Sequence, residues 1–164
     1  MSAAAESTEQ SPPRKGVRLT SDEAWQRIEA SHTGIITTLR RDGVPISLPV
    51  WFVTFDHQIF LSTPAGSKKV VRVRNDSRAS FLIEGGERWA ELTAVHLTGT
   101  ISLLEDEQLF ERIDAASHAK YASFRTSRSE MPSATRDHYA NTKAYLRFVP
   151  DPRIVSWDNS RLFS

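Results

Sequence analysis

The stretch Leu61-Ser62-Thr63-Pro64-Ala65-Gly66-Ser67-Lys68-Lys69 decides how the rest of the chain is interpreted. An apolar strand is predicted to end in a turn of small residues, and a short basic helix is predicted to follow it directly. The turn offers hydroxyl groups and free backbone N–H groups, and a helix N-terminus carries a partial positive charge. With two lysines beside it, this pattern predicts a site for an anionic group, most simply the phosphate of a cofactor.

The charge around this stretch is local. Between residues 66 and 78 the chain carries five cations and a single acid, Asp76, whereas the whole sequence has 21 Lys and Arg against 20 Asp and Glu. A nearly neutral chain has no overall field that favours nucleic acid or a membrane surface. We therefore expect the cations to serve one small anionic ligand.

Composition excludes several other chemistries. The chain has no cysteine, which rules out disulfides, thiol catalysis and cysteine metal sites. Its five histidines are scattered without ligand spacing, so no metal site is predicted. No apolar run approaches the ~20 residues that span a bilayer, and the first residues lack a hydrophobic signal segment. We expect a soluble cytoplasmic protein.

The chain is interpreted as one domain preceded by a tail. Residues 1–17 are rich in Ala, Ser, Glu and Pro and are predicted to be disordered, leaving residues 18–164 as the folded domain. Thr20-Ser21-Asp22-Glu23 has the pattern of a capping box and predicts a helix that ends near Ser31.

Alternating apolar residues and turn signals predict mostly strands beyond that helix. Strands are expected over residues 34–39, 44–55, 58–62, 79–83, 89–103, 144–149 and 153–157, and helices over 67–74, 105–121 and 134–141. Antiparallel meanders of this kind favour a closed barrel with helices outside it. The predicted fold class is therefore mainly β.

In this order of elements the chain resembles the flavin-binding split β-barrels of the pyridoxamine 5′-phosphate oxidase superfamily, and within it the flavin and deazaflavin (F420) oxidoreductases. Three segments carry the resemblance: Gly34-Ile35-Ile36-Thr37-Thr38-Leu39 with Gly43-Val44-Pro45, Pro49-Val50-Trp51-Phe52-Val53, and Ser62-Thr63 through Gly66-Ser67-Lys68-Lys69 to Arg78-Ala79-Ser80. The resemblance spans residues 19–157. It implies an antiparallel split barrel that forms a homodimer, with a cofactor in each groove at the interface.

The resemblance also assigns site residues. Thr63, Ser67, Lys68 and Lys69, with Ser62 beside them, would bind the cofactor phosphate, and Pro49, Val50 and Trp51 would line the ribityl chain and ring. Part of the strand predicted over residues 89–100, together with Trp157, would reach the partner's cofactor. For Trp51, packing in the barrel or at the interface is an equally good interpretation.

The cofactor is expected to be F420 or FMN. Pyridoxamine phosphate oxidases proper have an arginine on the ring-side strand, whereas residues 49–53 of this chain contain no cation. A site with fewer cations suits the phosphodiester of F420 somewhat better than the FMN dianion, although Arg72 or Arg74 offers compensation. No catalytic residue is assigned, because hydride chemistry would belong to the cofactor.

The expected function is an oxidoreductase that transfers hydride to a small unsaturated organic substrate, which the segment 121–131 would wall. Three alternatives stay open: a non-catalytic flavin- or haem-binding barrel, a pyridoxamine phosphate oxidase-type FMN enzyme, and a barrel that binds nucleic acid through residues 66–78. Near-neutral charge and the lack of a run of aromatic residues beside those cations count against the last.

Overall fold

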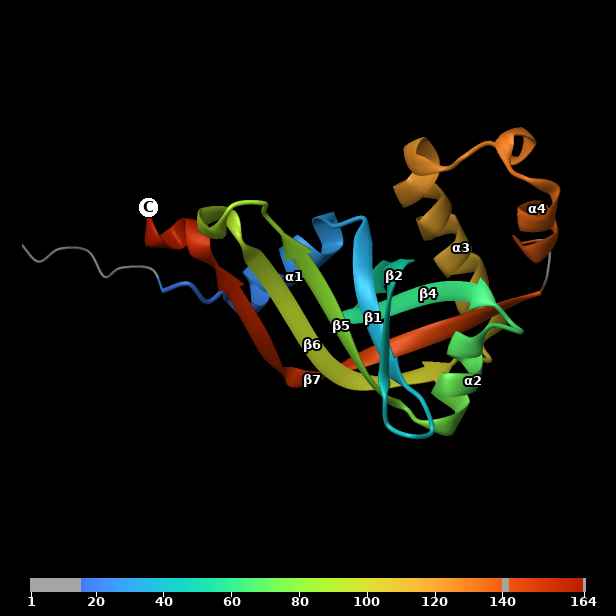
Figure 1. Ribbon diagram of the computed structural model, residues 1–164, viewed down its shortest axis with the longest axis horizontal. Helices are drawn as coiled ribbons and strands as arrows, with labels where there is room; N and C mark the ends of the chain where they lie inside the picture. The colour runs from blue at the N-terminus through green and yellow to red at the C-terminus, as the bar shows by residue number, and fades with distance from the viewer. Residues whose placement is uncertain (1–15, 140–141, 164) are drawn as a thin grey trace, which may run out of the picture.

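The computed structural model describes residues 16–139 and 142–163. Within them, seven strands form one antiparallel sheet in the order β2-β1-β5-β6-β7-β4-β3, which curls strongly, with helices outside it (Figure 1). The strands are β1 (Thr33–Leu39), β2 (Pro45–Trp51), β3 (Val53–Phe55), β4 (Gln58–Pro64), β5 (Arg78–Gly85), β6 (Thr93–Leu103) and β7 (Lys143–Asp158). This is an antiparallel split β-barrel, which confirms the predicted fold class.

The two edge strands of the sheet are neighbours in the chain. β2 and β3 lie at opposite ends of the strand order, yet Phe52 alone separates them. The sheet must therefore curl until its two edges meet at this residue. The prediction of one continuous strand over residues 44–55 was wrong, because the chain leaves the β1 ladder after Trp51 and enters the β4 ladder at Val53.

Apolar residues from every part of the sheet fill the barrel, and α1 (Ser21–Ala30) packs against them. Ala24, Trp25 and Ile28 form its buried face. The predicted capping box is present, since the Thr20 hydroxyl accepts from the Glu23 N–H and the Glu23 carboxylate accepts from the Thr20 N–H. α1 thus begins where the sequence predicts and contributes to the main core.

The outer face of the sheet carries a second apolar cluster under α3 (Glu107–Tyr121). Val53 and Phe60 from the β3–β4 hairpin and Tyr145 from β7 pack there against Ile113 of the helix. Phe110 stacks on Tyr145 with ring centroids 4.2 Å apart. The helix is fixed in this way across the strands that follow the Phe52 break.

β7 runs unbroken through Pro150-Asp151-Pro152, where two separate strands were predicted. The prolines are tolerated because the β6–β7 ladder shifts register between Leu97 and Gly99. Gly99 pairs with Pro150, and a Cβ added at this glycine would lie 2.2 Å from the Val149 carbonyl oxygen. A side chain at position 99 would therefore prevent the bend.

The remaining elements are short. Residues 89–91, predicted as the start of a strand, form the 3-10 turn η1 (Trp89–Glu91), and β6 begins after it. The segment after α3 contains η2 (Ala122–Phe124), η3 (Arg128–Glu130) and α4 (Ser133–Tyr139); the last two residues of the predicted helix 134–141 lie outside the described residues. So does the predicted tail, apart from Gly16 and Val17. Among the described helices, none has the length and apolar character that crossing a membrane requires.

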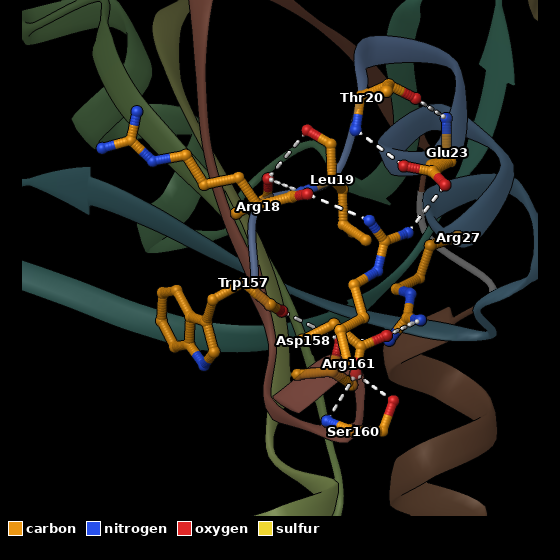
Figure 2. Close-up of polar contacts among 11 residues, drawn as sticks. Arg18, Leu19, Thr20, Glu23, Arg27, Trp157, Asp158, Ser160 and Arg161 are labelled. Atoms are coloured by element: carbon orange, nitrogen blue, oxygen red, sulfur yellow. Dashed lines mark hydrogen bonds and ion pairs between the residues drawn. The ribbon is translucent and has the colours of Figure 1, made fainter. Parts of the chain in front are cut away.

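Polar contacts join the start of α1 to the end of the chain at η4 (Asn159–Leu162), as Figure 2 shows. Arg161 donates to the Arg18 carbonyl at 3.0 Å and to the Glu23 carboxylate at 2.7 Å. Arg27 pairs with Asp158 at 2.9 Å, and the same carboxylate caps η4 by accepting from the Ser160 N–H. These contacts hold α1 against the end of β7.

Candidate functional site

The predicted phosphate site lies at the N-terminus of α2 (Lys68–Asn75). Ser67 is the N-cap of this helix, and its hydroxyl accepts from the Val70 N–H at 3.4 Å. Thr63, at the end of β4, is buried and donates to the Ser67 hydroxyl at 3.3 Å. The strand end and the helix start are thereby linked by their side chains.

Two backbone donors remain available at this helix start. The Ser67 N–H bonds to the Pro64 carbonyl at 3.0 Å, and the Val71 N–H bonds to the Ser67 carbonyl. No acceptor within residues 16–139 and 142–163 takes the N–H groups of Lys68 or Lys69. They are orphan donors of a first helical turn, which an anion satisfies well.

Lys68, Lys69 and Arg72 place three cations on α2. Within the described residues no carboxylate forms an ion pair with Lys68, Lys69 or Arg72. Burial and the nearby Arg72 charge lower the pKa of Lys69. Arg72 reaches across to β1, where its Nε donates to the hydroxyl of the fully buried Thr38 at 2.8 Å. The site therefore carries positive charge that no described carboxylate pairs with. A bound anion would relieve the repulsion between Lys69 and Arg72.

The sequence assigned no role to Thr38, and it left Arg72 either on a solvated helix face or as a compensating cation at the cofactor phosphate. The contact joins residues 34 positions apart, so no local sequence pattern predicts it. The available signal was the alternation along β1, which places Thr38 on the same buried face as Gly34 and Ile36, where a hydroxyl needs a partner.

The ring-side residues lie on the edge strand β2. Pro49 and Trp51 are exposed, whereas the Val50 side chain is buried in the barrel core. Val50 therefore offers a ligand only its backbone. As β2 pairs with β1 alone, alternate backbone groups along its other edge face away from the ladder. The structure thus leaves backbone donors and acceptors available beside Pro49–Trp51.

Trp51 is held by Tyr121, the last residue of α3. The two rings stack with centroids 4.3 Å apart and planes 3° apart. The Tyr121 hydroxyl accepts from the Phe52 N–H at 2.8 Å and donates toward the carbonyl oxygens of Phe52 and His32, at 2.8 and 2.7 Å. Burial raises the pKa of this phenol to about 12. Tyr121 therefore satisfies the backbone where neither strand ladder does.

This geometry corrects the expected substrate wall over residues 121–131. Tyr121 is fully buried, and its polar atom is engaged by backbone groups, so it cannot line an open substrate site. Phe124, by contrast, is 53% exposed. The exposed part of the predicted wall begins after Tyr121.

The ladder register brings the two halves of the predicted site to one end of the β3–β4 hairpin. Val53 pairs with Phe60 at the start of this ladder. The residues just before Val53, Pro49 to Trp51, and those just after Phe60, which lead to Thr63, therefore leave it at the same end. They then separate, since β2 pairs with β1 and β4 with β7. Ser62 and Lys68 are exposed near the place where the two halves separate.

A hollow of about 310 Å³ lies elsewhere, between α1, the β3–β4 turn and β7. It is lined by Trp25 of α1, the turn at Asp56 and His57, and the β7 bend at Pro150. His57 stacks on Trp25 at 4.6 Å. The part of the chain that the structure describes contains no group of three or more acidic or histidine side chains suited to a metal ion.

The family model of pyridoxamine 5′-phosphate oxidase matches residues 20–149, which is most of the chain and includes both halves of the site. Among proteins of curated function, none matches the sequence.

Solved structures share the whole architecture. The conserved hypothetical protein Rv2991 from Mycobacterium tuberculosis is 27% identical, with a TM-score of 0.76 and 94% of both chains covered. A FAD-binding protein from Mesorhizobium loti is 15% identical (TM-score 0.65; 85% of this chain and 96% of that chain). A heme-binding protein from Mycobacterium smegmatis is 18% identical (TM-score 0.62; 88% of this chain and 60% of that chain). At these identities the latter two establish the fold alone.

Proposed function

The chain belongs to the pyridoxamine 5′-phosphate oxidase family, and from that membership we propose that it is an oxidoreductase that binds a flavin-type cofactor, F420 or FMN. The reaction would transfer hydride between the cofactor ring and a small unsaturated organic substrate. Bound cofactor would supply the redox chemistry, and the protein would supply binding, orientation and exclusion of water.

The uncompensated positive charge at the start of α2 carries the proposal. The N–H groups of Lys68 and Lys69, the Ser67 hydroxyl and the Lys69 ammonium group are the donors that a phosphate requires. Thr63 positions the Ser67 hydroxyl, and Arg72 adds a second charge that no described acid neutralises. These residues fit the phosphate end of either cofactor.

The ring end of the cofactor is assigned to Pro49, Val50 and Trp51. Their strand edge supplies backbone donors and acceptors for the polar edge of the ring, and Trp51 supplies a flat apolar surface. Tyr121 fixes the tilt of that surface. The shared end of the β3–β4 ladder supports the view that one elongated ligand spans both halves.

F420 and FMN differ in the negative charge that the cations of the site must balance. The FMN phosphate is a dianion, whereas the F420 phosphodiester carries one charge. Residues 49–53 contain no cation, which favours F420. Arg72, held by its contact with Thr38 of β1, offers a second cation for the FMN dianion, which favours FMN. The Mesorhizobium loti structure makes FAD a further ligand to test, and the Mycobacterium smegmatis structure supports a haem-binding barrel as the second candidate.

We also propose a homodimer, with a cofactor in each groove at the interface. Exposed aromatic and aliphatic side chains on η1, on β7 and at the end of η4 support it: Trp89 is 63% exposed, and Phe163, the C-cap of η4, is 68% exposed. Sedimentation equilibrium would give the mass. A monomer at micromolar concentration would contradict the proposal.

Cofactor binding is tested by titrating the protein with F420, FMN, FAD and haem, following fluorescence quenching or, for haem, absorbance. The Lys68→Ala/Lys69→Ala variant should weaken binding of the preferred flavin by about 100-fold, because each lost charge-assisted bond costs at least about 1.5 kcal/mol. The matched control, Arg74→Ala/Arg78→Ala, removes two charges from the same region and should bind almost normally. Equal losses in both variants, or no flavin binding, would refute the assignment.

A further inference from the structure

Three neighbouring strands, β5, β6 and β7, carry a row of largely apolar side chains on the outer side of the sheet (Figure 1). Leu82, His96 and Val155 are direct cross-strand partners, so their side chains lie on the same side of the sheet. Val95 and Leu97, which flank His96 along β6, are buried in the barrel core. The row therefore faces away from the core, and Val155 is 43% exposed. The His96 imidazole, in the middle of the row, forms no hydrogen bond with another described residue.

Two opposite charges flank this row. Glu84 on β5 and Arg153 on β7 each lie two positions from a member of the row, so they share its side of the sheet. Glu84 pairs with Ala94, before His96 along β6, whereas the antiparallel register places Arg153 after His96. The acid and the cation therefore lie on opposite diagonals of the imidazole. Both are exposed, and no described residue forms an ion pair with either.

This arrangement of charge is complementary to itself. When two such faces pack together, a two-fold axis can lie in the plane of the interface, pass through His96 and cross the line from Glu84 to Arg153 at right angles. Glu84 of each protomer then meets Arg153 of the partner subunit, because a two-fold contact repeats every pair in both directions. A partner of a single sign would instead be repelled by one of the two charges. The face therefore fits a second copy of this chain.

We propose that the outer side of β5, β6 and β7 is the two-fold interface of the homodimer, in which Glu84 pairs with Arg153 of the partner subunit around a central pair of His96 side chains. This interface rests on the homodimer put forward with the proposed function. Trp157, which is 38% exposed, lies two positions beyond Val155 on the same side and extends the apolar part of the face. Apolar side chains at the centre would exclude water, and the two charge pairs would fix the orientation of the partners.

The central position of His96 makes association depend on pH. Protonation would bring two positive charges together among apolar side chains, whereas the neutral imidazole is tolerated there. The charged groups nearest in register are Glu84 on β5 and, on β7, Arg153 and Asp151. The first two would be paired with each other across the interface, and the Asp151 carboxylate already accepts from the Thr98 hydroxyl at 2.9 Å. The dimer should therefore weaken as the pH falls through about 6.5, where histidine side chains ordinarily titrate.

The test measures the dimer dissociation constant of the full chain by sedimentation equilibrium at pH 7.5. Glu84→Arg and Arg153→Glu should each weaken the dimer at least about 100-fold, because each substitution creates two contacts between like charges. The double variant Glu84→Arg/Arg153→Glu restores opposite charges in reversed order and should associate within about tenfold of the wild type. Glu111→Arg reverses an exposed acid on α3 as the matched control and should leave the dissociation constant unchanged.

A second series tests the histidine. Between pH 7.5 and pH 5.5 the wild-type dimer should weaken at least about tenfold, and the His96→Phe dimer by less than about twofold. Equal weakening of the two proteins would overturn the central place of His96.

The charge reversals have equally definite outcomes. A double variant that associates no better than the single variants would overturn the pairing of Glu84 with Arg153, and so would single variants that behave like Glu111→Arg. A dimer that ignores the reversals refutes this interface and leaves the homodimer standing, whereas a wild type that stays monomeric refutes both. Titration with the flavins decides the oxidoreductase role separately, because it does not depend on either result.

Discussion

Replacing Tyr121 by phenylalanine removes one oxygen atom from the point where the barrel changes partner strand. The ring and its stacking on Trp51 would remain. The Phe52 N–H would lose its acceptor, and the Phe52 and His32 carbonyls would lose the one proton that they share. An unsatisfied buried donor costs about 1–3 kcal/mol, and a lost shared bond about 1 kcal/mol more. We expect a loss of about 3 kcal/mol in the free energy of unfolding.

Tyr145→Phe is the matched control within the chain. Its hydroxyl donates to Asp114 at 2.7 Å, but the Asp114 side chain is 42% exposed, so water can replace the bond. We expect that variant to lose at most about 1 kcal/mol. Urea unfolding followed by tryptophan fluorescence measures both losses, and for a chain of this size about 3 kcal/mol corresponds to a Tm lower by about 6–12 °C. Equal losses in the two variants would refute the role given to the Tyr121 hydroxyl.

Substitutions at Gly34, Ser67 and Glu23, with their controls, test other parts of the structure. Gly34→Ala places a Cβ 2.1 Å from the Phe81 ring and should lower the free energy of unfolding by about 1–3 kcal/mol. Gly66→Ala meets open space and should change it by at most about 1 kcal/mol. Equal losses of the two variants in urea unfolding would contradict this. Ser67→Ala should cost about 1 kcal/mol as a lost helix cap and also weaken cofactor binding, whereas Ser67→Gly should restore most of the stability but not the binding. The Thr20 backbone N–H and the Arg161 side chain lower the pKa of Glu23 from 4.5 to about 2, so its contribution to stability is present above pH 4.5 and lost as the pH falls toward about 2. Glu23→Gln should flatten urea stability over that range, and an unchanged pH dependence would exclude this carboxylate as a source.

Local signals explain most of the agreement between sequence and structure. The capping box at Thr20 and the Ser67 cap act within three residues, and they place α1 and α2 as predicted. The phosphate half of the site was accessible for the same reason: Thr63 and Ser67 are four residues apart and touch each other.

The features that the sequence did not predict depend on contacts between distant residues. The strand break at Phe52 leaves no trace in the apolar run from Val50 to Val53, because the phenol that satisfies its backbone comes from 69 positions away. The bend in β7 likewise depends on a glycine in the neighbouring strand, Gly99. The burial of Tyr121 follows from the docking of α3, and periodicity alone could not distinguish it from an exposed residue of the loop.

The strand order has a consequence for how the protein is made. Of the seven described strands β7 is synthesised last, yet it lies between β6 and β4 in the finished sheet. Until it emerges, the β2-β1-β5-β6 sheet and the β3–β4 hairpin have no ladder to join them, and each presents an unpaired edge. α1 precedes all seven strands, so its contacts with the end of β7 also form only after β7 has been synthesised. Nascent chains that stall before Lys143 therefore expose two open edges to other chains, and these edges are natural binding sites for a chaperone.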